Sequence, residues 1–184
     1  TLINTEMNNR CPNKLICITI IIIIGLFNPS LTHGQKKTEE GFLGKAPLYK
    51  AKKAALEYLA DSSVFKKFGI ISDSIWCFAE LGMQAFRSSA ILIRTLKEEG
   101  FSVEKGVAGM PTCFVATWGS GKPVIGFLGE FDALPMLSQK PLTPVKDPVV
   151  DGAPGHGCGH NMMGTAAVAA IIAVKKSMEQ NGIR

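Results

Sequence analysis

The stretch Val124-Ile125-Gly126-Phe127-Leu128 is continuously apolar, and it is followed at once by Gly129-Glu130-Phe131-Asp132. A short apolar run of this kind, bounded by glycine and proline, is typical of a β-strand that is buried on both faces within an α/β sheet. Glu130 and Asp132 then lie at the carboxyl end of the predicted strand, where α/β folds place their ligands. The sequence therefore predicts an α/β fold with an acidic site beside this strand.

Two shorter segments before this strand have the same β character. Residues 101–105 and 113–118 are rich in β-branched and aromatic side chains. Glycine and proline turns separate these two segments from each other and from the third predicted strand, 123–129. We therefore expect three strands in the part of the chain between residues 101 and 129.

The preceding residues show helical periodicity. Apolar residues recur at three- and four-residue spacing from near Pro47, and again over 71–78 behind the start signal Ser72-Asp73. A third helix is predicted to begin with a cap at Ser88-Ser89 and to end at Gly100, because glycine takes the left-handed cap conformation without penalty. Together with the predicted strands, these helices indicate a mixed sheet flanked by helices.

A long loop is predicted over residues 135–155, which contain five prolines and little periodicity. Loops of this length within a compact domain are uncommon unless they serve a site. A helix over 162–178, capped by Asn161, is predicted to follow the loop. This helix is apolar on nearly all sides, so we expect it to be buried.

A second chemical motif lies at the end of the loop, in Gly155-His156-Gly157-Cys158-Gly159-His160-Asn161. Imidazole nitrogen and thiolate sulfur are preferred donors for zinc and similar divalent ions. The intervening glycines let the backbone turn tightly enough for neighbouring side chains to converge. The motif therefore predicts a metal site, with Cys158 and His160 as ligands, because alternate residues on a tight turn can face one ion.

Taken together, the two motifs resemble the family of metal-dependent amidohydrolases and peptidases that includes aminoacylases, carboxypeptidases and auxin-conjugate hydrolases. The likeness rests on Gly129-Glu130-Phe131-Asp132-Ala133-Leu134-Pro135 and on the Cys-Gly-His segment, and it spans about residues 45–184. The stretches 75–82 and 107–112 also match one branch of this family. The resemblance implies a catalytic domain of the zinc-aminopeptidase type, of which this chain is expected to be a truncated, amino-terminal part.

The resemblance also implies roles for single residues. It carries the ligand role onto Cys158 and His160, and it makes Asp132 the predicted catalytic-site carboxylate that orients the metal ligands. Many relatives have a histidine ligand where this chain has Glu130, so Glu130 is expected to support the ligands or to contact the substrate. For His156 three roles are open: a third ligand, a group that supports the ligands, which is the role we favour, or a contact for a substrate carboxylate.

The activity implied by the resemblance is metal-dependent hydrolysis of the amide bond in N-acyl amino acids such as p-aminobenzoyl-glutamate. One or two divalent ions, zinc or manganese, are the expected cofactors. Two alternatives are a dipeptidase or general aminoacylase on the same scaffold, and a non-catalytic, exported metal-binding protein. The general base and the remaining ligands are expected beyond residue 184, so this chain alone is expected to be inactive. The resemblance leaves open whether the protein assembles with copies of itself or with a second subunit.

An export signal is predicted at the amino-terminal end. From the expected start at Met7, Arg10 and Lys14 precede an apolar run over 15–27. Such a run is too short to span ~30 Å of hydrocarbon as a helix, but it fits the apolar core of a secretory signal. Residues 1–34 are therefore predicted to be a signal peptide that sends the protein to the periplasm or out of the cell.

The remaining residues divide into two predicted parts. Residues 35–45 are polar and form a predicted disordered leader, and 46–184 form the amino-terminal part of the metallohydrolase domain. The alternative to export is a membrane anchor through residues 15–27.

Removal of the signal would leave three cysteines, Cys77, Cys113 and Cys158, which do not form a disulfide framework. We expect Cys77 and Cys113 to be small buried side chains.

The net charge of +5 and the pI near 9.0 raise the question of an anionic partner. Much of the positive charge is local, and no aromatic residues or nucleic-acid motif accompany it. We therefore expect a solvated helix face and no nucleic-acid partner. The lysines concerned are Lys36, Lys37, Lys45, Lys50, Lys52, Lys53, Lys66 and Lys67.

Overall fold

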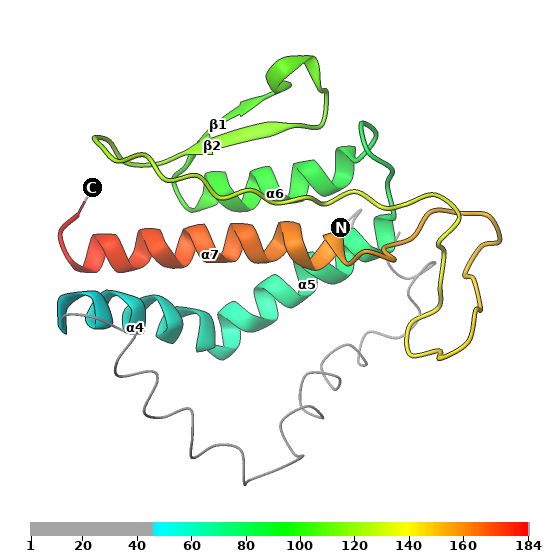
Figure 1. The fold of residues 1–184 in the computed structure, drawn as a ribbon, viewed down its shortest axis with the longest axis horizontal. Helices are drawn as coiled ribbons and strands as arrows, with labels where there is room; N and C mark the ends of the chain where they lie inside the picture. The colour runs from blue at the N-terminus through cyan, green and yellow to red at the C-terminus, as the bar shows by residue number, and fades with distance from the viewer. Residues whose placement is uncertain (1–45, 184) are drawn as a thin grey trace, which may run out of the picture.

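The computed structural model describes residues 46–183, and Figure 1 shows their arrangement. The predicted signal peptide and disordered leader, residues 1–45, lie outside this range. No helix within residues 46–183 is long and apolar enough to cross a membrane. The elements in chain order are α4 (Ala46–Ala60), α5 (Ser62–Phe78), α6 (Phe86–Glu98), β1 (Ser102–Lys105), the 3-10 turn η1 (Val107–Gly109), β2 (Phe114–Thr117) and α7 (His160–Gln180).

The core forms around helix α7, which contacts α4, α5 and α6. Figure 1 shows α7 running between α4 and α5 on one side and α6 on the other. Ile172 of α7 and Ile75 of α5 are completely buried, and they belong to one apolar cluster. The prediction of a buried carboxyl-terminal helix is therefore confirmed. The cluster consists of Phe68, Ile71, Ile75, Phe78, Ile91, Leu92, Leu96, Phe101, Val168, Ala169 and Ile172.

Helix α5 begins ten residues before the predicted start signal. The side chain of Asp61 accepts hydrogen bonds from the backbone N–H groups of Ser63 (2.9 Å) and Val64 (3.2 Å), which have no partner within the helix. The predicted start at Ser72-Asp73 is therefore wrong, because these residues lie in the middle of α5. Asp61 instead provides the polar side chain that caps the amino-terminal end of the helix.

Helix α6 begins at Phe86, and its cap also differs from the predicted one. Ser88 and Ser89 lie inside the first turn and are buried, so neither is the capping residue. The carboxylate of Glu80 instead accepts the N–H groups of Arg87 and Ser88 from outside the helix. At the other end, Gly100 follows the helix with a φ of 84°, which confirms it as the glycine that ends α6.

Strands β1 and β2 form an antiparallel hairpin in which Ser102 pairs with Thr117 and Lys105 pairs with Phe114. They confirm the predicted strands 101–105 and 113–118. The third predicted strand, 123–129, is wrong for the described residues, whose sheet has two strands. No described strand lies beside 123–129, and the side chains of Val124 and Leu128 are 85% and 91% exposed. The described residues are therefore α/β in content, but the mixed sheet is not present among them.

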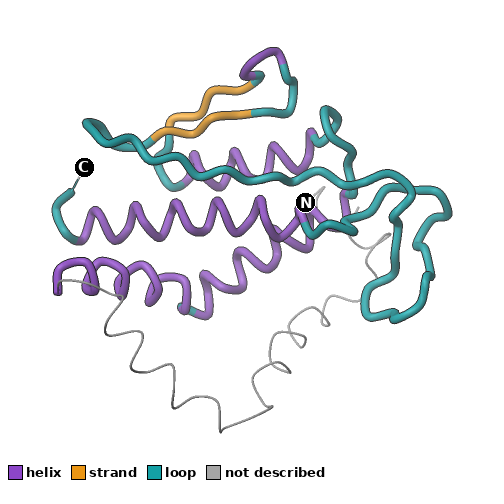
Figure 2. Tube along the Cα trace, viewed as in Figure 1, coloured by secondary structure: helices purple, strands orange, loops and turns teal. Residues whose placement is uncertain are grey.

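The predicted loop over 135–155 is confirmed, since this segment forms no helix or strand (Figure 2). Two backbone hydrogen bonds of 3.0 Å, in both directions between Leu134 and Gly155, bring its two ends together. Helix α7 then begins at His160, after Gly159 in the left-handed conformation with a φ of 75°. Asn161 is therefore not the cap; its buried side chain donates to the hydroxyl oxygen of Ser72 (3.1 Å).

The cysteines differ in their surroundings. Cys77 is buried, as predicted, but it is disulfide-bonded, so the expectation that it serves only as a small apolar side chain is wrong. Cys113 is a half-buried free thiol, and Cys158 is an exposed free thiol. The two free thiols are therefore the ones available for metal binding among the described residues.

A close approach between segment 129–131 and α7 depends on two glycines. A Cβ atom at Gly129 would lie 2.8 Å from the Cβ of Ala167, and one at Gly164 would lie 2.8 Å from the carbonyl oxygen of Glu130. Carbon atoms do not approach other atoms this closely without displacement. Glycine at both positions therefore lets the acidic segment lie directly on the helix.

We expect Gly164→Ala to destabilise the protein by about 1–3 kcal/mol, because the new methyl group meets backbone rather than a flexible side chain. Gly69→Ala is the matched control: Gly69 lies within α5, and nothing lies within 4 Å of an added Cβ. This control should stabilise the helix by about 0.5–1 kcal/mol. Urea unfolding measures both changes, and equal effects of the two substitutions would contradict the close packing.

A cluster of charges joins α5 and α7 to the residue that follows α6. Glu99, whose side chain is 14% exposed, accepts hydrogen bonds from Lys67 of α5 (3.1 Å) and Lys176 of α7 (2.9 Å). Burial by itself raises the pKa of Glu99, but the hydrogen bonds and positive charges of Lys176 and Lys67 outweigh burial and hold the pKa below its ordinary value. The ionised carboxylate therefore stabilises the folded chain.

This pKa shift sets the direction of a pH effect. A carboxyl whose pKa is lowered by folding stabilises the protein above the unfolded pKa of about 4.3, and this contribution is lost as the pH falls through the folded pKa. Glu99→Gln should therefore reduce the free energy of unfolding at pH 7. The difference in unfolding free energy between this variant and the wild type should become smaller as the pH falls below about 4. The exposed neighbour Glu98 provides the control variant Glu98→Gln, for which a comparably large pH-dependent gap would contradict the assignment.

Candidate metal site

The site forms where segment 129–133 crosses the amino-terminal end of α7. His160 is the first residue of α7, and its side chain is only 12% exposed. Glu130 and Asp132 come from the extended segment that lies on the helix through Gly164. Two parts of the chain that are about 30 residues apart therefore meet at one imidazole ring.

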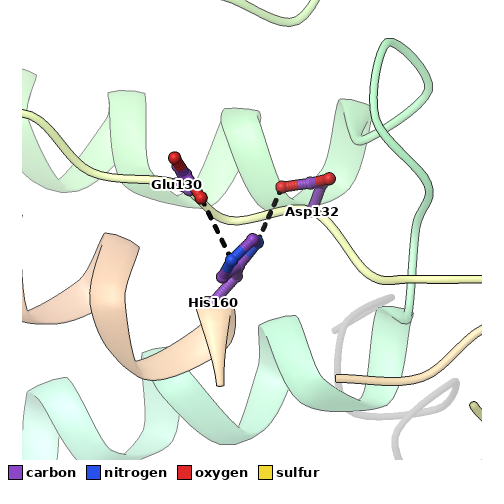
Figure 3. A group of neighbouring side chains, drawn as sticks. All are labelled: Glu130, Asp132 and His160. Carbon is purple, nitrogen blue, oxygen red and sulfur yellow. Dashed lines mark hydrogen bonds and ion pairs between the residues drawn. The ribbon is translucent and has the colours of Figure 1, made fainter. Parts of the chain in front are cut away.

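Both ring nitrogens of His160 contact a carboxylate, as Figure 3 shows. Nδ1 lies 2.9 Å from Oδ1 of Asp132, and Nε2 lies 3.0 Å from Oε2 of Glu130. One ligand atom from each of the three residues can be chosen so that all lie within 4.8 Å of one another. Among the described residues, this is the one group of three or more His, Cys, Asp or Glu side chains that converges in this way.

The two contacts place a requirement on what lies between the atoms. A neutral imidazole carries one N–H and one lone pair. If Nδ1–H donates to Asp132, the lone pair of Nε2 faces an oxygen of Glu130, and two electron-rich atoms at this distance attract each other only through a proton or a cation between them. The arrangement is therefore suited to hold a positive charge between His160 and Glu130.

The residues fit a divalent metal ion by donor type as well as by position. Imidazole nitrogen and carboxylate oxygen are donors that zinc and manganese accept. A histidine that binds a metal commonly donates its other ring N–H to a carboxylate, which fixes the orientation of the ring. Asp132 is placed for this role, and Glu130, whose side chain is 54% exposed, is placed to share the ion with Nε2.

Asp132 is held in place by the backbone of the two residues that follow it. The N–H of Ala133 donates to the carbonyl oxygen of Glu80 (2.7 Å), and Leu81 pairs with Ala133 as an isolated parallel bridge. The reciprocal hydrogen bonds of Leu134 with Gly155 then connect this segment to the second motif. The carboxylate is therefore anchored to the turn after α5 and to the loop before α7.

His156 is not part of the converging group and contacts α5 instead. Its Nε2 lies 3.0 Å from the carbonyl oxygen of Ile75 in α5, while its Nδ1 is buried without a hydrogen-bond partner. Burial lowers the pKa of His156, an effect that the hydrogen bond with Ile75 opposes and the nearby charge of His160 reinforces. The neutral ring therefore ties the Gly-rich loop to α5, and the three predicted roles for His156 stay open.

Cys158 lies apart from this group. Its thiol is free and the residue is exposed, and it is not among the three side chains that converge. The ligand role of Cys158 therefore stays a prediction. The structure gives Glu130 a more central position than the sequence suggested, and the signal for it was a carboxylate two positions before Asp132.

Comparisons with known proteins show which proteins this chain is similar to. No family model matches the chain. One of the subunits of the p-aminobenzoyl-glutamate hydrolase of Escherichia coli (strain K12) is 46% identical over 117 residues, which are 64% of this chain and 24% of that protein. The Xaa-Arg dipeptidases of Mus musculus and Homo sapiens are 28% and 25% identical, each over 79% of this chain and 32% of the relative.

These relatives are named as a hydrolase and as dipeptidases, which agrees with the resemblance of the two motifs to metal-dependent amidohydrolases and peptidases. The chain spans about a quarter of the length of the E. coli relative and about a third of the length of the two dipeptidases. The identity reaches 46% in the part that is shared with the E. coli protein.

We expect His160→Ala to remove most Zn²⁺ binding, since it deletes the one nitrogen donor of the converging group. Asp132→Asn should weaken Zn²⁺ binding by about 10- to 100-fold, because Asp132 orients the ring of His160 and does not itself bind the ion. Glu104→Gln, on the exposed face of β1, is the control and should leave affinity unchanged. Competition with a chromophoric chelator measures the dissociation constants.

The variants Cys158→Ala and His156→Ala decide the roles that stay open. Loss of metal in Cys158→Ala as complete as in His160→Ala would establish Cys158 as a ligand. Retained metal in His156→Ala would leave it a supporting or substrate-binding group, whereas complete loss would make it a ligand. Unchanged metal content in Cys158→Ala would show that Glu130 and His160 hold the ion without the thiol.

Proposed function

We propose that this chain belongs to an enzyme that hydrolyses the amide bond of N-acyl amino acids such as p-aminobenzoyl-glutamate with the help of a divalent metal ion. The observation that carries the proposal is the position of His160 between the carboxylates of Asp132 and Glu130. Such a site suits a cation, and the E. coli relative that shares 46% of the aligned residues is named for this hydrolysis. Zinc and manganese are the metals we propose.

The chain's own residues would prepare the site. Asp132 accepts the hydrogen bond of Nδ1 and so leaves the lone pair of Nε2 for the ion, while Glu130 supplies negative charge on the opposite side. A bound divalent ion supplies Lewis acidity, which polarises an amide carbonyl and makes water a stronger nucleophile near neutral pH. The low exposure of His160 limits competing water around the ring.

A dipeptidase is the second candidate. The observation in its favour is the similarity to two relatives named Xaa-Arg dipeptidase, which extends over more of this chain than the similarity to the E. coli protein, although at lower identity. Both candidates break an amide bond next to an amino acid, so the same metal site serves either. A substrate panel distinguishes them.

We also propose a catalytic domain of the zinc-aminopeptidase type. The antiparallel hairpin packed beside the helices supports this fold. A second subunit is proposed because the E. coli relative is named as a subunit. Export is proposed from the order of basic and apolar residues over 10–27, and sequencing of the mature amino terminus would reject it if the chain in cells still begins at Met7.

The function is tested on the whole protein encoded by the gene. We expect it to hydrolyse p-aminobenzoyl-glutamate with Zn²⁺ or Mn²⁺, to lose activity on chelation, and to lose most activity in His160→Ala. Glu104→Gln serves as the control away from the site. Faster hydrolysis of dipeptides with carboxyl-terminal arginine would favour the second candidate, and activity that survives both chelation and His160→Ala would reject the metal mechanism.

A further inference from the structure

Glu80 makes an unusually complete set of hydrogen bonds for a residue in a turn. Its side chain is 11% exposed and lies between α5 and α6. One carboxylate oxygen accepts from the backbone N–H and from Nε of Arg87 (3.1 and 3.2 Å), and the other accepts from the N–H and the hydroxyl of Ser88 (2.9 and 2.8 Å). The carboxylate therefore fixes the turn 79–85 to the start of α6.

The same turn lies directly against the site. The carbonyl oxygen of Glu80 accepts the N–H of Ala133 at 2.7 Å, and Leu81 pairs with Ala133. At Gly82, an added Cβ would lie 3.4 Å from Oδ2 of Asp132, so the backbone of the turn passes beside that carboxylate. A shift of the turn would therefore move Asp132, and with it the orientation of His160.

We propose that Glu80 is a positioning residue for the metal site, acting through Asp132. Its side chain immobilises the turn, and its backbone carbonyl transmits that position to the residue after Asp132. Metal ligands must be held to within about 0.5 Å of their productive geometry, so a turn that is fixed by four hydrogen bonds has a direct effect on affinity. The proposal rests on the metal site of the proposed function.

Glu99 offers a matched control for this proposal. It is buried to a similar degree, it too accepts hydrogen bonds from basic side chains, and it also connects α6 with other helices. Its partner Lys176 lies 16 residues along α7 from His160, which corresponds to roughly 24 Å of helix. Loss of either carboxylate should lower the stability of the fold, but only loss of the Glu80 carboxylate should weaken metal binding at the site.

The test compares Glu80→Gln with Glu99→Gln by Zn²⁺ competition and by thermal unfolding. In Glu80→Gln, an amide N–H₂ replaces one oxygen and faces N–H donors, so the turn is released. We expect the dissociation constant for Zn²⁺ to rise about 10-fold, the lower end of the range for groups that orient ligands, and to stay within about two-fold of wild type in Glu99→Gln. Ser88→Ala, which removes one of the four bonds, should fold and give an intermediate change.

Hydrogen exchange gives a readout that needs no metal. The amide of Ala133 should lose protection in Glu80→Gln and Ser88→Ala but not in Glu99→Gln. If both Glu80→Gln and Ser88→Ala keep wild-type affinity for Zn²⁺ and wild-type protection at Ala133, the proposal is overturned. Wild-type protein that binds no Zn²⁺ would reject the proposed metal site, while exchange at Ala133 would still decide whether Glu80 positions the segment.

Discussion

The arrangement of the site depends on helix α5, which holds both chemical motifs at once. Ser72 accepts the side chain of Asn161, Ile75 binds the ring of His156, and the residue after the helix cap, Glu80, accepts the N–H of Ala133. These contacts join segments separated by 53 to 89 positions in sequence. The apolar core behind α5 is therefore what keeps two glycine-containing stretches of chain in register with each other.

The segments that α5 holds in place meet at the imidazole ring of His160. Its two nitrogens face two carboxylates that belong to one extended segment, and the close contact of that segment with Gly164 leaves little freedom for either acid. Negative charge is thereby gathered around a ring that is nearly buried. Because two carboxylates lie beside one imidazole, a cation at this position is attracted by both of their charges.

The sequence predicted features that local signals control, and it failed where distant partners decide. Gly100 marks a helix end and the hairpin strands follow their β-branched residues, since both depend on near neighbours. The start of α6 depends on Glu80, which lies outside the helix. Whether 123–129 forms a strand depends on a neighbouring strand with which it could pair. For the site, donor type favoured His160 and the family resemblance favoured Asp132, but only the three-dimensional contact showed that Glu130 faces the same ring as Asp132.

The extended segment 124–128 has a consequence for how this chain behaves in solution. Its backbone makes no hydrogen bonds with other described residues, and most of its side chains are turned outward. An exposed apolar segment whose backbone groups have no partner is a template to which another extended chain can add, including a second copy of the same segment. Self-association should therefore begin at this segment and grow with protein concentration, while a charged side chain introduced at Val124 would suppress it without touching the metal-binding residues.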